Sequence, residues 1–217
     1  MPPDLVVTPI RDAATIILLR NGVEGPRVLM GQRGAKAVFM PSKYVFPGGA
    51  VDVADGDVPM ASPLDAALHA GLTARSVSNP QAIAAAAIRE LAEETGQVIG
   101  APGAGCDWPG FEGLIPDPQP LRFVFRAVTP PGPPRRFDAR FFLANADAVC
   151  TDPDDFSAAE DELGHLHWVP LAEARQLDMP FITEIVLAEI TALIEDGSTA
   201  GVPFLDNSAE RSAIHRL

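Results

Sequence analysis

The stretch RELAEETG at residues 89–96 decides the fold and the chemistry that we expect of this chain. It ends a run of good helix formers, and the glycine that closes it is a typical C-terminal stop, so the sequence predicts a helix over 81–95. On such a helix Glu90, Glu93 and Glu94 lie on one side, because positions i, i+3 and i+4 share a face. The opposite face is apolar and suited to packing on a sheet.

Three carboxylates on one helix face repel one another at neutral pH, each like-charged neighbour costing about 0.2–0.5 kcal/mol. A hard divalent cation such as Mg²⁺ would relieve the repulsion, because it takes oxygen ligands from carboxylates, water and phosphate. The alternative is the solvated polar face of an ordinary amphipathic helix, which accounts for most patterns of this kind. A Gly-Gly turn upstream and the residues that flank the three glutamates favour the interpretation as a cation-binding face.

Further segments on both sides of this helix predict a sheet. Apolar, β-favouring runs predict strands over 14–19, 27–31, 45–46, 121–128, 137–143 and 167–169. Helical signals predict a short helix from Leu64 to near Arg75, a turn of helix at 171–174 and a C-terminal helix over 181–194. This order predicts an α/β or α+β fold in which helices flank a mixed sheet.

Length, charge and cysteine content narrow the class of protein. The chain has 217 residues, which fits a single domain, and its formal net charge of −13 with no basic cluster argues against nucleic-acid binding. The chain has two cysteines, which is too few for a disulfide framework. Its apolar run near the N-terminus is too short to span a membrane, and the first residues are not typical of a signal peptide. We therefore expect a cytoplasmic protein without a membrane partner, and a homodimer remains open. The C-terminal His215-Arg216-Leu217 only loosely resembles a peroxisomal address.

Two segments together resemble the Nudix box, written G-x5-E-x7-R-E-U-x-E-E-x-G-U with U aliphatic. They are FPGG at residues 46–49 and RELAEETG at residues 89–96, which matches every specified position of its half. The segment WVPLAEA at residues 168–174 is similar to the strand and turn that follow the box in many Nudix proteins, so the resemblance covers about residues 12–195. It implies a Nudix-type α/β/α sandwich with a mixed sheet flanked by helices.

The first half of the box departs from the family pattern. Arg89 follows Gly49 by 40 positions, roughly 26 more than the pattern has, which predicts a segment inserted at about 53–78 of a single domain over 1–217. The first glutamate of the box falls on Asp55 when counted forward from Gly49 and on Gln81 when counted back from Arg89. That glutamate is therefore absent. Because the second half is intact, we interpret the change as divergence of a loop and not as loss of activity.

The resemblance implies hydrolysis of a nucleoside diphosphate linked to another group, with Mg²⁺ or Mn²⁺ as cofactor. It makes Glu93 and Glu94 metal ligands and catalytic residues, with Glu90 as a further ligand or a group that supports them. The carbonyl of Gly49 is carried over as a further metal ligand. Such a reaction requires mainly charge neutralisation and alignment at phosphorus.

Other residues receive supporting roles. Arg89 is expected to brace the box through a carboxylate, with Glu93 as the expected partner. Gly48 and Gly96 are structural, and a tight turn alone also explains Gly48-Gly49. For the general base we favour Glu162 and then Glu160, although a solvated acidic turn explains them equally well.

Four cations are candidates for binding substrate phosphates: Arg33, Lys43, Arg136 and Arg140. The alternative for each is an ordinary surface charge. An insertion inside the box, together with segments 32–49 and 135–142, resembles the branch that includes peroxisomal coenzyme A diphosphatases. That branch implies CoA or acyl-CoA as substrate; ADP-ribose, NADH and other nucleoside-diphosphate derivatives are alternatives, as is a non-catalytic Nudix ligand-binding regulator. The inserted helix is either a lid over the site or a helix packed on the flank of the domain.

Overall fold

A computed structural model describes residues 8–197, 201–209 and 211–217. Its strands are β1 (Ile10–Gly22), β2 (Gly25–Arg33), β3 (Tyr44–Val45), β4 (Gly48–Ala50), β5 (Gly100–Pro102), β6 (Leu114–Pro116), β7 (Arg122–Val128), β8 (Arg136–Asn145), β9 (Leu163–Pro170), β10 (Pro203–Asp206) and β11 (Ala213–Arg216). Its α-helices are α1 (Ala66–Thr73), α2 (Pro80–Thr95) and α3 (Phe181–Asp196). Short 3-10 helices are η1 (Val53–Asp57), η2 (Ala146–Ala148) and η3 (Ala174–Gln176).

The main sheet is mixed and contains nine strands. Its order is β11-β10-β7-β8-β1-β2-β3, with β4 paired to β1 and β9 paired to β2. The pairs β1–β8 and β7–β10 are parallel and the other pairs are antiparallel. Strands β5 and β6 form a separate two-stranded sheet.

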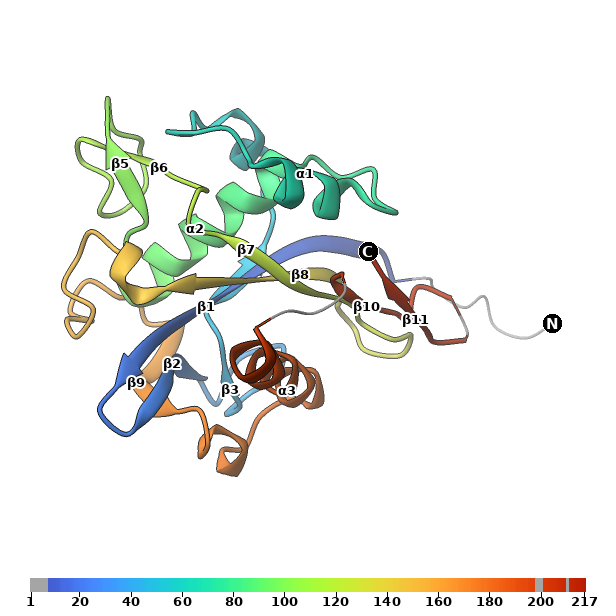
Figure 1. Ribbon diagram of the computed structural model, residues 1–217. Coiled ribbons are helices and arrows are strands. Elements are labelled where there is room, and N and C mark those ends of the chain that lie inside the picture. The colour runs from blue at the N-terminus through green and yellow to red at the C-terminus, as the bar shows by residue number, and fades with distance from the viewer. Residues whose placement is uncertain (1–7, 198–200, 210) are drawn as a thin grey trace.

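Helices cover both faces of this sheet. Figure 1 shows α1 and α2 on one face and α3 on the other. Two apolar clusters fill the layers: one joins α1 and α2 to the sheet, and the other joins α3 to its opposite face. This three-layer arrangement confirms the predicted α/β/α sandwich with a mixed sheet flanked by helices.

Helix α2 is the central element of the upper layer. The side chain of Asn79 accepts a hydrogen bond from the backbone N–H of Gln81 at its start, and Gly96 ends the helix in the left-handed conformation with φ of 71°. The helix is buried along most of its length, from Ala82 to Ile88 and again at Leu91. Burial reaches the acidic end as well, so the three glutamates of α2 are not on a freely solvated face.

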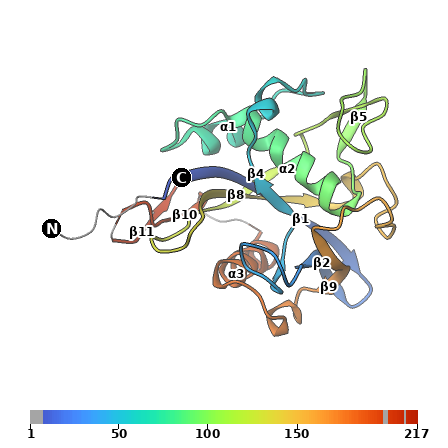
Figure 2. The ribbon, with the colours of Figure 1, turned by 180° about the vertical axis from the view of Figure 1, so that it is seen from behind.

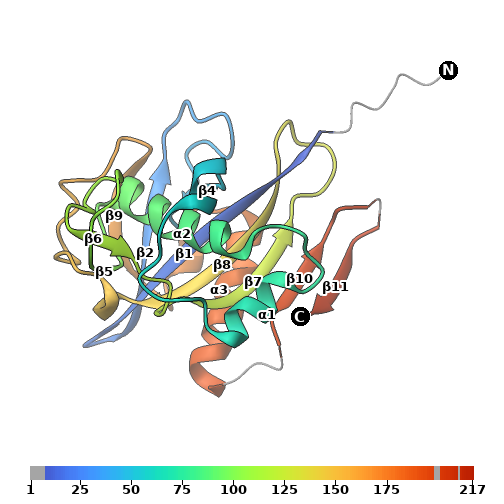
Figure 3. The same cartoon turned by 90° about the horizontal axis from the view of Figure 1, so that it is seen from above.

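The inserted segment packs on the flank of the domain. Leu68 and Leu72 of α1 are buried in the same apolar cluster as α2, and a side chain at Gly71 would meet Phe123 of β7 at 3.0 Å. Figure 3, seen from above, shows α1 beside β7. The structure thus favours the flank position of this helix over a lid.

Several elements differ from those that the sequence predicts. Strand β9 is longer than the predicted 167–169 because its ladder with β2 extends to Leu163. The proline-rich region holds the β5–β6 hairpin in addition to β7, and the C-terminal hairpin β10–β11 was not predicted. The helical turn predicted at 171–174 is found slightly later, as η3. In the part of the chain that the structure describes, no helix is long and apolar enough to cross a bilayer.

Candidate active site

The acidic end of α2 lies against the Gly-Gly turn at β4. Figure 2 shows β4 beside α2, where it pairs with β1. The backbone N–H of Gly48 donates a hydrogen bond to Oε2 of Glu94 at 2.7 Å. The structure therefore brings the two halves of the box together, although 40 positions separate Gly49 from Arg89.

Both glycines of this turn lie where no side chain fits. A Cβ at Gly48 would lie 2.5 Å from the backbone oxygen of Ala14, and a Cβ at Gly49 would collide with the carboxylate of Glu90. Glycine is thus required for the close approach of this turn to β1 and to α2. A tight turn alone does not explain Gly49, because the group that excludes its side chain is a glutamate of the helix.

Arg89 links the inserted segment to the acidic helix. Its side chain is 9% exposed, and its Nη1 donates to Glu93 at 2.7 Å and to Glu90 at 2.9 Å. Its Nε and Nη2 donate to the two carboxylate oxygens of Asp55 at 2.8 and 3.1 Å. Arg89 thus has the expected bracing contact with Glu93, and with two further carboxylates.

Asp55 is a residue of this site that sequence reasoning missed. It lies in η1 at the start of the inserted segment and is 1% exposed, and its carboxylate also accepts the backbone N–H of Asp52 at 2.8 Å. Counting forward from Gly49 along the Nudix pattern ends on this residue. An aspartate therefore stands where the pattern has glutamate and forms a bidentate pair with Arg89. The forward count was the available signal, and the long insertion obscured it.

Burial disfavours the charged forms of all three glutamates. It raises the pKa of Glu90 to about 7, despite the opposing charge and hydrogen bond of Arg89. Burial likewise raises the pKa of Glu93 against the effect of Arg89. Burial also raises the pKa of Glu94 well above its ordinary value, against the hydrogen bond from the N–H of Gly48 and the charge of Arg33.

The charge of the cluster fits a divalent cation, but its side chains are not arranged around one. Oε1 of Glu94 is buried and has no hydrogen-bond partner, and one guanidinium, that of Arg89, faces several carboxylates. Carboxylate oxygens are the ligands that Mg²⁺ prefers. Within residues 8–197, 201–209 and 211–217, no three or more acidic, histidine or cysteine side chains are grouped so that they would hold a metal ion. Glu90 and Glu93 instead point to Arg89.

An acidic loop approaches the same end of α2. The backbone N–H of Glu160 donates to the carbonyl of Glu93 at 2.8 Å, and Arg33 Nη1 lies 3.0 Å from Oε1 of Glu162. The charge of Glu162 contributes to the raised pKa of both Glu90 and Glu94. Of the predicted site residues outside the box, Arg33, Glu160 and Glu162 therefore lie beside the glutamate cluster.

The other three predicted phosphate ligands contact different partners. Lys43 pairs with the exposed Asp178 in front of α3. Arg136 is buried and donates to the carbonyls of Thr129 and Asn207. Arg140 is 1% exposed and its partners are Asp12, Asp138, Ser76 and Ser78. The structure does not bring these three side chains to the acidic end of α2.

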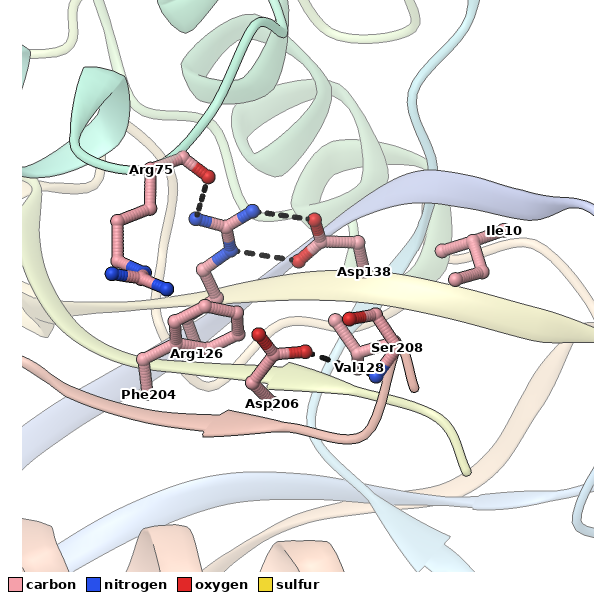
Figure 4. A pocket seen from close by; sticks show the side chains of 8 residues that line it. All are labelled: Ile10, Arg75, Arg126, Val128, Asp138, Phe204, Asp206 and Ser208. Atoms are coloured by element: carbon pink, nitrogen blue, oxygen red, sulfur yellow. Dashed lines mark hydrogen bonds and ion pairs between the residues drawn. The ribbon is translucent and has the colours of Figure 1, made fainter. Parts of the chain in front are cut away.

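Two cavities lie apart from the glutamate cluster. Figure 4 shows the larger one, of about 500 Å³, where the guanidinium of Arg126 pairs with Asp138 and stacks over Phe204. The smaller one, of about 430 Å³, lies between α1, the start of β7 and α3. No residue of the box lines either cavity, so neither belongs to the site at the end of α2.

The chain is similar in structure to solved Nudix hydrolases. A Nudix hydrolase from Alicyclobacillus acidocaldarius has 29% identity and a TM-score of 0.61, with 84% of this chain and 91% of that chain covered. A MutT/nudix family protein from Enterococcus faecalis has 16% identity and a TM-score of 0.51, with 86% and 63% covered. An Ap4A hydrolase from C. elegans has 14% identity and a TM-score of 0.50, with 86% and 99% covered. No family model and no curated protein matches the chain.

These neighbours show the Nudix fold. The hydrolase from Alicyclobacillus acidocaldarius, at 29% identity, supports placing the chain in the Nudix superfamily. The residues of the site agree with this fold, since the Gly-Gly turn and the glutamates of RELAEETG meet in space. Fold and site together define an enzyme of the Nudix hydrolase class, which acts on phosphorus-containing anhydrides.

Proposed function

We propose that this chain is a metal-dependent pyrophosphohydrolase that cleaves a nucleoside diphosphate linked to another group. The observation that carries the proposal is the unpartnered, buried Oε1 of Glu94 beside the Gly-Gly turn. A carboxylate oxygen without a partner is costly in a buried place, and a cation would satisfy it. Such a cation would also attract the dense negative charge of a pyrophosphate to an acidic protein surface.

Four groups of this chain would hold Mg²⁺ or Mn²⁺: the carboxylates of Glu90, Glu93 and Glu94, and the carbonyl of Gly49. The chemistry that such an ion supplies when bound is neutralisation of phosphate charge and activation of water. Arg89 stabilises the ionised forms of Glu90 and Glu93, which a metal ligand needs. Asp55 and the carbonyl of Ala50 hold Arg89 in place from the other side.

Glu162 is the general base in this proposal. Its carboxylate takes one proton from water as the water oxygen forms a bond to one phosphorus. The bond from that phosphorus to the bridging oxygen breaks, and its electron pair stays on the leaving phosphate. Glu162 suits this role because its side chain is 56% exposed and reaches solvent, whereas Glu94 is buried.

CoA or acyl-CoA is the substrate that we propose to test first. The support is the resemblance of the inserted box and of segments 32–49 and 135–142 to the branch with coenzyme A diphosphatases. ADP-ribose, NADH and other nucleoside-diphosphate derivatives are the comparison substrates. Helix α1 packs on the flank of the domain, so the inserted segment gives no support for a lid that would cover the acyl arm of acyl-CoA.

The test is an assay of CoA esters, dinucleotides and ADP-ribose with Mg²⁺ or Mn²⁺, comparing the natural chain with Glu93→Gln and Glu94→Gln. We expect metal-dependent release of phosphorylated products, and a loss of about 100- to 1000-fold in kcat in either variant, because each removes charge from the site. Glu195→Gln, on the exposed end of α3, is the matched control and should leave kcat unchanged. The proposal would be refuted by turnover that needs no metal and is the same in the natural chain and in both site variants.

A further inference from the structure

The ion pair between Arg33 and Glu162 is built by the register of two strands. Arg33 is the last residue of β2, and it lies opposite Leu163, the first residue of β9. Glu162 directly precedes β9, so the sheet itself places the two side chains next to each other. Their contact of 3.0 Å therefore depends on backbone that is already fixed.

The segment that carries Glu162 is also tied to the acidic helix. The N–H of Glu160 donates to the carbonyl of Glu93, and a side chain at Gly96 would meet the Cβ of Ala158 at 3.1 Å. The segment 158–162 thus runs from the end of α2 to the end of β2. The backbone is held at both ends, and the carboxylate of Glu162 is the part that remains to be positioned.

Arg33 is the group that positions this carboxylate. Within the ranges that the structure describes, no other hydrogen bond or ion pair reaches the side chain of Glu162, and none other reaches the guanidinium of Arg33. The Arg33 side chain is only 17% exposed, whereas that of Glu162 is 56% exposed. Solvent thus reaches the carboxylate of Glu162 more readily than the guanidinium that holds it.

The charges of both side chains act on the glutamates of α2. The charge of Glu162 raises the pKa of Glu90 and Glu94, and the charge of Arg33 lowers that of Glu94. A carboxylate of this exposure, left without a cation beside it, would be repelled by the acidic cluster. Arg33 offsets that repulsion at the position where Glu162 is needed.

We infer that Arg33 is a positioning residue, which holds Glu162 at the edge of the glutamate cluster and does not bind a substrate phosphate. Only one carboxylate oxygen of Glu162 contacts Arg33, so the other is free to take a proton from water. This inference rests on the proposed function, and it replaces the phosphate-binding role that the sequence alone suggests for Arg33.

A double-mutant cycle tests the inference: kcat and KM are measured for Arg33→Gln, Glu162→Gln and the double variant. Loss of the base should lower kcat by about 100-fold or more. Misplacing it through Arg33→Gln should lower kcat by about 10- to 100-fold with little change in KM, and Arg33→Lys should restore part of the loss. In the Glu162→Gln background the Arg33 substitution should have no further effect, since there is no base left to position.

Arg20→Gln is the matched control, because Arg20 forms a comparable ion pair with Asp154 at 2.8 Å and, within the described residues, has no ion pair or hydrogen bond with a glutamate of α2. This variant should keep its kcat. Thermal unfolding of Arg33→Gln should stay close to that of the natural chain, since an ion pair whose carboxylate is more than half exposed contributes little to stability.

Three results would overturn the inference while the natural chain still shows metal-dependent turnover. They are additive losses in the double variant, a raised KM for Arg33→Gln, or an unchanged kcat for Glu162→Gln. Additive losses with a raised KM would return Arg33 to the role of phosphate ligand. Absence of metal-dependent turnover in the natural chain refutes the proposed function itself, so the two failures are distinguishable.

Discussion

Two networks of buried arginines and carboxylates lie in this molecule, and they differ in charge balance. In the first, Arg126 and Arg140 join β7 and β8 and are matched by the carboxylates of Asp138 and Asp12. In the second, at the end of α2, Arg89 pairs with Asp55, Glu90 and Glu93, and Glu94 lies beside them. The first network is balanced, and the second has an excess of negative charge.

The difference shows what each network is for. The balanced network holds elements together, as Arg126 does by donating also to the carbonyls of Ala74 and Arg75 after α1, although Nε of Arg140 is buried without a hydrogen-bond partner. In the second network burial, together with the charges of Glu90 and Glu162, raises the pKa of Glu94, and Oε1 of Glu94 has no hydrogen-bond partner. Carboxyl groups whose pKa is shifted in this way are typical of sites that bind a charged ligand.

Removing one carboxylate from each network should have the largest effect and should separate the two roles. Asp55→Asn and Asp138→Asn should each lower the free energy of unfolding by about 3–5 kcal/mol, because each leaves a buried guanidinium short of its bidentate partner. Denaturation in urea measures this loss. Asp55→Asn should in addition lower activity by about 10- to 100-fold, since Arg89 then no longer holds Glu90 and Glu93 in place.

The folded fraction of Asp138→Asn should keep the kcat of the natural chain. A comparable loss of activity in both variants, normalised to folded protein, would show that the two networks do not have separate roles. Equal stability of Asp55→Asn and the natural chain would show that the pair with Arg89 is not a structural brace.

The effect of metal on stability should come next in size and should depend on pH. The pKa of Glu90 is raised by folding from 4.5 to about 7, so this group contributes stability that is complete at low pH and is lost as pH rises through about 7. Bound Mn²⁺ favours the ionised carboxylates, which form above that pH. At a Mn²⁺ concentration near 100 times Kd, stabilisation should approach about 2.7 kcal/mol.

Thermal unfolding with and without Mn²⁺, at about pH 6 and about pH 8, measures this effect. The upward shift in Tm should be larger at the higher pH. A shift of equal size at both pH values would mean that the raised pKa of Glu90 plays no part in cation binding.

A substitution in the balanced network that preserves its charge should have the smallest effect. Arg140→Lys removes hydrogen bonds to Asp12, Ser76 and Ser78, and we expect it to lower the free energy of unfolding by about 1–2 kcal/mol. KM for the best substrate should not change. A KM raised tenfold in this variant would restore the phosphate-binding role that the sequence suggests for Arg140.

The sequence was most informative where local signals agreed. Helix α2 was predicted over 81–95 and lies at Pro80–Thr95, because good helix formers, the Asn79 cap and the Gly96 stop all act locally. The meeting of the Gly-Gly turn with the glutamates followed from the family motif and not from local signals. That motif spans an insertion whose length carries no information about distance in space.

Tertiary partners explain what the sequence did not reveal. Nothing near Arg140 in the chain shows that Asp12, 128 positions away, is its partner, so a buried brace was taken for a phosphate ligand. The same holds for Arg33 and Glu162, which the β2–β9 ladder brings together. The β10–β11 hairpin was missed because its four-residue strands are short, and because β10 depends on pairing with β7 and β11 on pairing with β10.

The central claim is that the excess negative charge at the end of α2 exists to bind a divalent cation. Its most direct test is calorimetric titration of Mn²⁺ into the metal-free natural chain and into Glu94→Gln near pH 8. We predict saturable binding to the natural chain, with proton release, and a loss of affinity of at least about 10-fold in the variant. Absence of binding to the natural chain, or equal affinity in both proteins, would contradict the claim.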